Sequence, residues 1–282
     1  FLGHLLLMLI LLFVISPAGT AQSTDRCGGD RSTFLQDLIT RSIDRYLTEQ
    51  VEGDLFSGTV VVDRHGEVIF RKGYGLSNRE FAVEAKPEHK FMMGSCTKAF
   101  TATAIMICKE RGLFGDLKTE LMCDYLEPEI TCPDAWRTIT LYDLLTMSSG
   151  LPDVSEYNDG IATMVTFSTR ELIEFTGTMP MHAEPGTAYE YNNTNYLILG
   201  YILERVTGSS YEAFLKEEIF RPFGMDETGA YKQDEIVPLM ASGYRLEGNS
   251  LDTTLLKADY YAVSYAIATG NLYTTIDDFH RW

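Results

Sequence analysis

A serine and a lysine stand three residues apart at the start of a long apolar run, in the tetrapeptide Ser95-Cys96-Thr97-Lys98. The run predicts a helix from Ser95 to Arg111 that ends at Gly112. Residues at positions i and i+3 lie on one face of a helix, so the side chains of Ser95 and Lys98 can touch. A serine hydroxyl becomes a good nucleophile when a base takes its proton, and a neutral lysine amine is such a base. The pair predicts covalent acyl-transfer chemistry; the alternative is a helix-capping serine beside a surface lysine.

A second motif, Tyr191-Asn192-Asn193, lies downstream and supplies further groups that such chemistry needs. The Tyr191 hydroxyl can relay a proton to the leaving group from the other side of Ser95. The Asn193 amide offers donors and an acceptor that can hold Lys98 and an acyl-amide substrate. Tyr191 and Asn193 therefore join Ser95 and Lys98 as candidate catalytic residues. The alternative for this motif is a turn before a helix, where asparagine is common.

With these motifs, the chain resembles the serine β-lactamase and penicillin-binding-protein superfamily, in its class C β-lactamase, D-Ala-D-Ala carboxypeptidase and esterase branch. That branch uses Ser-x-x-Lys followed by Tyr-x-Asn. The likeness runs in order and spacing over roughly residues 55 to 282, through 91–104, 139–152, 185–196 and 276–279. The resemblance implies a serine hydrolase without metal or cofactor, and substrate binding by Ser149 and Gly150.

The chain departs from the family pattern at three places. Met147 stands where a histidine is usual, and Gly270-Asn271 replaces a usual Gly-Gly pair, which predicts a less permissive turn. The third family element, Lys-Thr-Gly or His-x-Gly, is absent because the chain stops at Trp282. We therefore expect a C-terminally truncated domain that lacks half of its oxyanion hole and is inactive alone.

The resemblance also implies the fold class, which is α+β. An antiparallel sheet flanked by helices would contain an all-helical insert, at about residues 110–225. The segments 59–63 and 68–71 predict the first hairpin of that sheet. The remaining strands would lie beyond the chain end, so residues 22–282 are expected to form one partial domain.

Apolar periodicity predicts the other helices. Phe34 to Leu47 should form an amphipathic surface helix behind a Thr33-x-x-Gln36 capping box. Four more helices are expected at Leu141–Met147, Arg170–Thr176, Tyr196–Val206 before Gly208, and Tyr211–Phe220 before Pro222.

The N-terminus indicates export. Leu5 to Ile15 is apolar throughout, and Pro17 and small residues up to Ala21 follow, which fits a signal peptide at 1–21 that lacks its start. The apolar run is too short to span a bilayer comfortably, so no stable membrane span is expected after cleavage. We expect a secreted or periplasmic protein; the alternative is a retained membrane anchor.

Composition and charge limit the classes of partner that the protein is expected to bind. Hydrophobic residues make up 45% of the chain, enough for a large core. Asp and Glu outnumber Lys and Arg by 40 to 23, and the formal charge of −17 repels nucleic acid and anionic membranes. The five histidines show no metal-ligand spacing. A small-molecule or peptide substrate is therefore the expected partner.

The five cysteines suggest one disulfide. Cys123 and Cys132 bracket a short loop and are the best candidate pair. Cys96 and Cys108 lie on one predicted helix about 18 Å apart, too far to be bonded. Cys27 is left over. Cys96 is also an alternative nucleophile, but it points about 100° around the helix from Ser95, which favours a packed thiol.

Two classes of function follow from the sequence. The first is a serine hydrolase that acts on an amide or ester, such as a β-lactam, a D-amino-acid peptide or a small ester, through an acyl-serine intermediate. The second is a non-catalytic penicillin-binding-like module that binds a peptide or protein partner through the same cleft.

Overall fold

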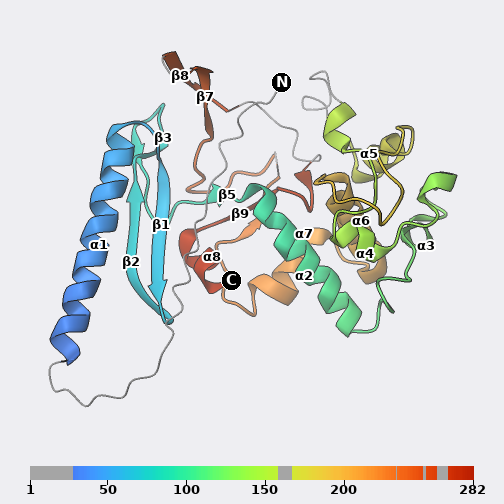
Figure 1. The fold of residues 1–282 in the computed structure, drawn as a ribbon, viewed down its shortest axis with the longest axis horizontal. Coiled ribbons are helices and arrows are strands. Elements are labelled where there is room, and N and C mark those ends of the chain that lie inside the picture. Colours follow the sequence, from blue (N-terminus) through green and yellow to red (C-terminus); the bar gives the residue numbers. More distant parts are fainter. Residues whose placement is uncertain (1–27, 158–166, 233, 250–251, 259–265) are drawn as a thin grey trace. The chain divides into compact units, whose positions relative to one another are not determined.

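The computed structural model describes residues 28–157, 167–232, 234–249, 252–258 and 266–282. These residues form two compact units (Figure 1). Unit 1 takes in the described residues of Phe1–His89 and Leu239–Ala258, and unit 2 those of Lys90–Pro238 and Asp259–Trp282. All candidate site residues fall in unit 2.

Unit 1 is built from one long helix and small antiparallel sheets. Its elements are α1 (Gly28–Glu52), β1 (Gly58–Arg64), β2 (Glu67–Tyr74), β3 (Leu76–Asn78), β4 (Val83–Glu84), β7 (Tyr244–Asn249) and β8 (Asp252–Lys257). The pairs are β1–β2, β3–β4 and β7–β8. His65 and Gly66 both have positive φ at the β1–β2 turn, and Asp63 Oδ1 accepts a hydrogen bond from the Gly66 N–H at 2.9 Å. The predicted first hairpin is confirmed.

Helix α1 differs from the prediction at its start. It begins at Gly28, so Thr33 lies inside the helix and the predicted capping box was wrong. The apolar face is largely exposed, with Phe34 at 65% and Leu38 at 53%, while Ile43 and Leu47 are half-buried. Packing of an apolar face therefore contributes less to this helix than it does to most helices in proteins.

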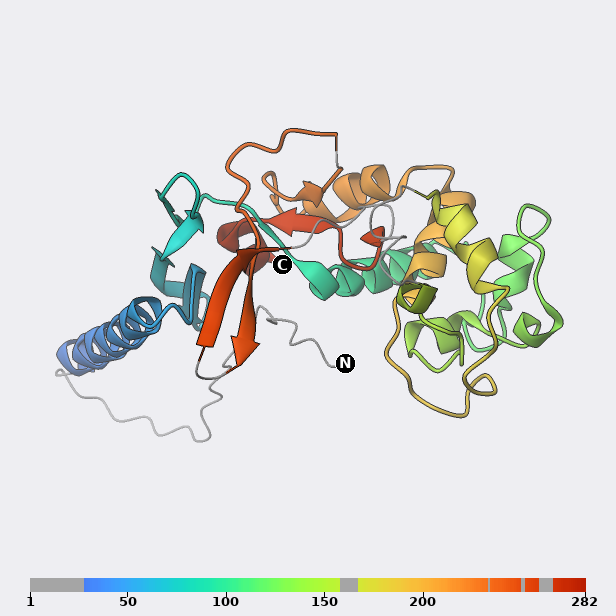
Figure 2. The same cartoon turned by 90° about the horizontal axis from the view of Figure 1, so that it is seen from above.

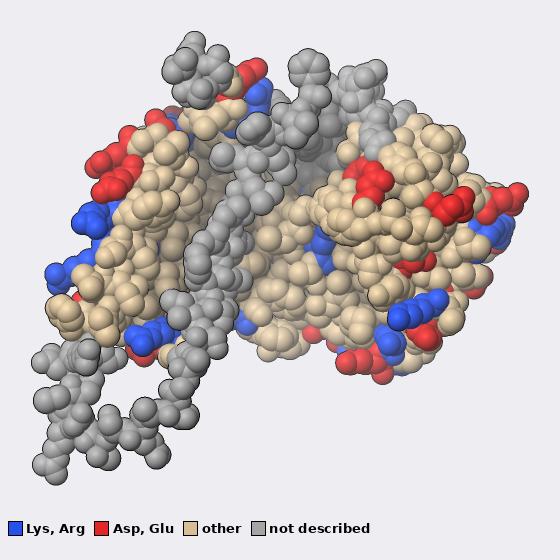
Figure 3. Space-filling view, in the orientation of Figure 1, with Lys and Arg blue, Asp and Glu red and all other residues tan. Residues whose placement is uncertain are grey.

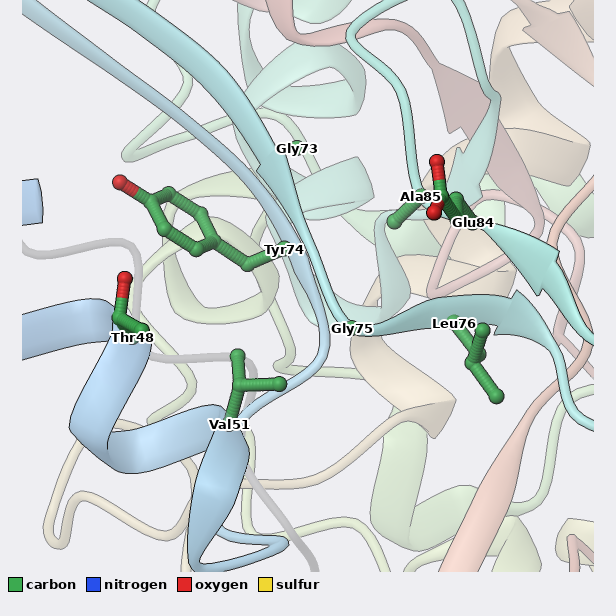
Figure 4. Close-up of a pocket in the computed structure, with 8 residues that line it drawn as sticks. All are labelled: Thr48, Val51, Gly73, Tyr74, Gly75, Leu76, Glu84 and Ala85. Atoms are coloured by element: carbon green, nitrogen blue, oxygen red, sulfur yellow. The ribbon is translucent and has the colours of Figure 1, made fainter.

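The contact between α1 and β2 is polar as well as apolar. Asp44 on α1 accepts hydrogen bonds from Lys72 Nζ at 2.5 Å and from the Tyr74 hydroxyl at 2.6 Å. These bonds, chiefly the one from Lys72, hold the pKa of Asp44 below its ordinary value. Beside them lies a hollow of about 450 Å³, with Thr48 and Val51 of α1 on one side of it (Figure 4). The rest of its lining is Gly73, Tyr74, Gly75, Leu76, Glu84 and Ala85.

Unit 2 is mainly helical. Its helices are η1 (Gly94–Cys96), α2 (Thr97–Glu110), α3 (Met122–Leu126), η2 (Asp134–Trp136), α4 (Leu141–Leu145), η3 (Val154–Tyr157), α5 (Thr169–Thr176), α6 (Thr194–Thr207), α7 (Tyr211–Leu215), the π-helical turn η4 (Lys216–Phe220) and α8 (Ile276–Arg281). Its strands β5 (Phe91–Met92), β9 (Leu272–Thr274) and β6 (Gly229–Ala230) form one antiparallel sheet in that order. The α+β fold class is confirmed.

Helix α2 lies in the middle of unit 2, beside strand β9 (Figure 2). It buries Phe100, Ala104 and Cys108, which recur at four-residue spacing on one face. Helix α6 is buried along most of its length, and a Cβ at Gly200 would come within 2.5 Å of the Ala268 Cβ. Glycine at 200 therefore lets the 266–270 segment approach α6 closely. This segment includes Thr269, whose carbonyl accepts a hydrogen bond from Lys98.

Most helix ends agree with the expectations from sequence. Gly112 and Gly208 have the positive φ that ends α2 and α6. Helix α4 begins with a capping box between Thr140 and Asp143. The predicted helix at 211–220 is split into α7 and a π-helical turn, a division that apolar periodicity does not reveal.

The cysteines are placed as predicted where the structure describes them. Cys123 and Cys132 form a disulfide with a Cα–Cα distance of 6.0 Å. Cys108 is a buried free thiol, and burial raises its pKa to about 11. Cys27 and the expected signal peptide lie outside the described residues.

Lys and Arg side chains are interspersed with Asp and Glu side chains over the face shown in Figure 3. Among the helices that the structure describes, none is both long and apolar enough to cross a bilayer.

Candidate active site

Ser95 is presented to solvent by a sharp turn. Gly94 has a φ of +51°, a left-handed backbone conformation that costs energy for residues other than glycine. The chain then enters the short η1 helix and α2, which leaves Ser95 exposed. Cys96 is half-buried and packs against the core. The hydroxyl is thus accessible, while the neighbouring thiol packs inward.

Lys98 is buried one turn further on, with 6% of its surface exposed. Its Nζ lies 3.2 Å from Ser95 Oγ, 2.8 Å from Asn193 Oδ1 and 3.0 Å from the Thr269 carbonyl oxygen. A protonated ammonium group would donate one hydrogen to each of these three oxygens. A neutral amine has two hydrogens, which the two carbonyl oxygens can accept, so its lone pair is left for the Ser95 hydroxyl proton. The arrangement therefore suits a general base.

Tyr191 approaches Ser95 from another segment of the chain. Its hydroxyl donates to Ser95 Oγ at 2.6 Å, and its ring centroid lies 5.0 Å from Lys98 Nζ. The side chain is 48% exposed, so it can meet an incoming molecule. Tyr196, whose pKa is raised by burial, has its ring centroid 5.9 Å from the same Nζ. Two aromatic rings therefore lie within 6 Å of the Lys98 amine.

Asn193 stands at the start of α6 and links Lys98 to Asp153. Its Oδ1 faces Lys98, whereas its backbone N–H and Nδ2 donate to Asp153 Oδ2 at 2.8 and 3.2 Å. The structure thus brings together the four residues predicted to be catalytic. Asp153 was not among them.

The Thr269 carbonyl was also missed from sequence. It lies in a tight loop in which Ala268 has a φ of +61°. Asn271 Oδ1 accepts the Ala268 N–H at 3.2 Å, and Thr101 Oγ1 donates to the Ala268 carbonyl at 2.7 Å. Neither Gly270 nor Asn271 has a positive φ, so the backbone of this loop does not require glycine at 271. Asparagine at 271 instead fastens the loop that carries the acceptor.

Ser149 and Gly150, for which the resemblance implied substrate binding, are both buried. Ser149 has no exposed surface, and its Oγ donates to Asn195 Oδ1 at 2.5 Å. Gly150 is buried with a φ of +71°, and a Cβ there would lie 2.0 Å from the Ala183 carbonyl oxygen. Both residues hold the loop in place, and their role in substrate binding stays a prediction.

This loop is fastened to the Tyr191 segment by backbone and side-chain bonds. The Met147 carbonyl accepts the Glu190 N–H at 2.9 Å, and Asn192 Nδ2 donates to the Leu151 carbonyl at 2.8 Å. Met147 itself is buried, so the position where a histidine is usual contributes apolar packing. Within the described ranges, no group of three or more His, Cys, Asp and Glu side chains is arranged to hold a metal ion.

Comparisons with known proteins agree with this geometry. The family model described as Beta-lactamase matches residues 43–282. PbpX of Bacillus subtilis (strain 168), named as a penicillin-binding protein, is 33% identical over 227 residues, which cover 80% of this chain and 54% of PbpX. The chain thus spans about half the length of that relative.

Solved structures show the same fold. The octameric penicillin-binding protein homologue from Pyrococcus abyssi is 28% identical, with a TM-score of 0.69 over 85% of this chain and 54% of that one. The D-amino acid amidase from Ochrobactrum anthropi SV3 is 22% identical, with a TM-score of 0.70 over 85% of this chain and 69% of that one. Because the family model takes in most of the chain, including Ser95, Lys98, Tyr191 and Asn193, the protein belongs to the β-lactamase family.

Proposed function

We propose that the protein is a serine hydrolase that cleaves an amide or ester through an acyl-serine intermediate. The observation that carries this proposal is the placement of an exposed Ser95 Oγ within hydrogen-bond distance of both Lys98 Nζ and the Tyr191 hydroxyl. One group can remove the serine proton and the other can give a proton to the leaving group. A binding module has no need for both.

Acylation begins when neutral Lys98 takes the Ser95 proton as Oγ attacks the substrate carbonyl carbon. The carbonyl oxygen becomes an oxyanion, and the Ser95 backbone N–H at the start of the helix is one donor that can stabilise it. As the tetrahedral intermediate collapses, the bond to the leaving group breaks. The leaving group takes the Tyr191 proton, and protonated Lys98 returns a proton to Tyr191. Water then cleaves the acyl-serine ester by the reverse sequence of proton transfers.

The candidate substrates are β-lactams, D-amino-acid peptides or amides, and small esters. The D-amino acid amidase and the penicillin-binding relatives support the amide class, since their names describe chemistry on amide bonds or binding of a β-lactam. Tyr191 contacts Ser95, and its exposed ring, with the exposed Tyr189 two residues earlier in the chain, favours an apolar or aromatic group in the substrate.

We also propose that the protein is exported. The disulfide between Cys123 and Cys132 supports an oxidising compartment, because structural disulfides are rare where thiols are kept reduced.

The test is covalent labelling of the full-length protein with a fluorophosphonate and with a fluorescent penicillin, read by intact mass. One adduct on the parent protein and none on Ser95→Ala is the expected result. Cys96→Ser is the matched control, since it alters the adjacent position and should keep the adduct. Absence of labelling by both probes, together with binding of peptide to folded protein, would favour the binding module. Labelling of the parent followed by assays with nitrocefin, a D-amino acid amide and a p-nitrophenyl ester then selects the substrate class.

A further inference from the structure

We propose that Asp153 is a positioning residue that holds the Asn193 amide in the one orientation in which its oxygen faces Lys98. This inference rests on the proposed function, because it concerns how Lys98 is made ready to act as the base. The observation behind it is that one carboxylate oxygen of Asp153 takes both donors of Asn193, while the Asn193 oxygen is turned to Lys98.

Asp153 holds Asn193 through two hydrogen bonds. Asp153 Oδ2 accepts the Asn193 backbone N–H at 2.8 Å and its Nδ2 at 3.2 Å. The backbone contact fixes where the residue stands, and the side-chain contact fixes how its amide is turned. Rotation of the amide would break the second bond, and it would also bring an amide oxygen against the carboxylate. An ionised carboxylate accepts hydrogen bonds and donates none, so only one amide orientation satisfies it.

Asp153 is itself held in place. Its other oxygen, Oδ1, accepts the Ser155 N–H at 2.7 Å, an aspartate turn that fixes the carboxylate on its own backbone. The neighbouring Pro152 carbonyl accepts Thr194 Oγ1 at 2.7 Å, which fastens the loop to the start of α6. The bond from Ser155 therefore fixes the carboxylate, and the bond from Thr194 fixes its loop next to Asn193.

The consequence for the reaction lies in the lone pair of Lys98. With the Asn193 oxygen turned toward it, a neutral Lys98 gives its two hydrogens to Asn193 and Thr269, and the lone pair is left for Ser95. An inverted amide would present its NH₂ group to the lysine and take up that lone pair. Loss of Asp153 should therefore slow acylation at saturating reagent and leave reagent binding almost unchanged.

The test measures phosphonate labelling of the full-length protein as a function of reagent concentration, which separates the maximal rate from the half-saturation concentration. Asp153→Ala should lower the maximal rate about 10- to 100-fold, as expected for a misplaced catalytic group. Asp153→Asn keeps an acceptor oxygen for both Asn193 donors and should restore the rate to within about 5-fold of the parent. Glu171→Ala is the matched control, because it removes a carboxylate that also accepts two bonds, both from Ser168 at 2.7 Å, at the start of α5. It should label at the parental rate.

A double-mutant cycle separates positioning from a purely structural role. Combined with Asn193→Ala, the Asp153→Ala change should cost less than about 2-fold, since no amide remains to be oriented. A loss in that background as large as in the parent would overturn the proposal. So would parental labelling by Asp153→Ala, or an Asp153→Asn protein that melts normally yet labels as slowly as Asp153→Ala. A parent protein that takes no label at all would refute the proposed function instead.

Discussion

Replacement of Ser149 by alanine tests whether this residue supports the fold or binds substrate. In the structure its Oγ is fully buried, donates to Asn195 Oδ1 and accepts the Leu151 N–H at 3.2 Å. Asn195 and Leu151 also have no exposed surface. Ser149→Ala leaves both of these polar groups without that partner, and each unpaired buried group costs about 1–3 kcal/mol. The free energy of unfolding should therefore fall by roughly 2–6 kcal/mol.

Urea unfolding and thermal melting measure this loss. One kcal/mol moves the melting temperature by about 2–4 °C for a domain of this size, so a fall of at least about 4 °C is expected. Thr178→Ala is the control: its exposed hydroxyl donates to the Phe175 carbonyl, and its removal should change stability by less than about 0.5 kcal/mol. Well below the melting temperature, Ser149→Ala should keep the parental half-saturation concentration for the labelling reagent.

The opposite pattern would refute the reasoning. A Ser149→Ala protein with parental stability but a raised half-saturation concentration would show that the hydroxyl reaches the substrate. The burial argument would then be wrong, and the predicted substrate-binding role would be supported.

Three further predictions follow from the same contacts. Lys98→Met should slow acylation by about 10²- to 10⁴-fold, the usual effect of losing a positioned general base, as measured by phosphonate labelling; a parental rate would contradict the mechanism. Replacing Cys123 and Cys132 by serine should lower the free energy of unfolding by about 2–3 kcal/mol in urea titrations, because the bond closes a loop with a sequence separation of 9. Hydrogen bonds, the largest from Lys257, hold the pKa of Glu80 at about 2, against an ordinary value of 4.5. The stability that these hydrogen bonds give to the β7–β8 hairpin is complete above pH 4.5 and is lost as the pH falls toward 2. Amides of the hairpin should therefore lose protection from hydrogen exchange over that range. Glu80→Gln should abolish this pH dependence.

The parts of the site that sequence reasoning found are those with a short-range pattern. Ser95 and Lys98 share one helix face, and their contact follows from helical geometry. Tyr191 and Asn193 carry distinctive side chains within one motif, and the chemistry of these side chains predicted their contacts with Ser95 and Lys98.

The parts that were missed depend on tertiary structure or on ordinary residue types. Thr269 contributes a backbone carbonyl, which every residue has, so no side-chain type marks it. Asp153 follows a Gly-Leu-Pro segment, where an aspartate usually means a turn. The β7–β8 hairpin was missed because its first strand contains Gly248, a residue type that is depleted in strands and that pairs here with Thr253. The early start of α1 shows that an exposed helix can continue through a segment whose sequence fits a capping box.

The hydrogen bonds of Lys98 also bear on how the candidate site assembles during folding. Its two carbonyl acceptors lie 95 and 171 residues further along the chain. Helix α2 can form from local contacts within microseconds, whereas these two bonds require closure of very long loops. A refolding chain therefore passes through states that are already helical but in which Ser95 has no oriented base. If the protein acts as proposed, a phosphonate will react only once those loops have closed, so labelling would follow a late step of folding that circular dichroism of the helices does not detect.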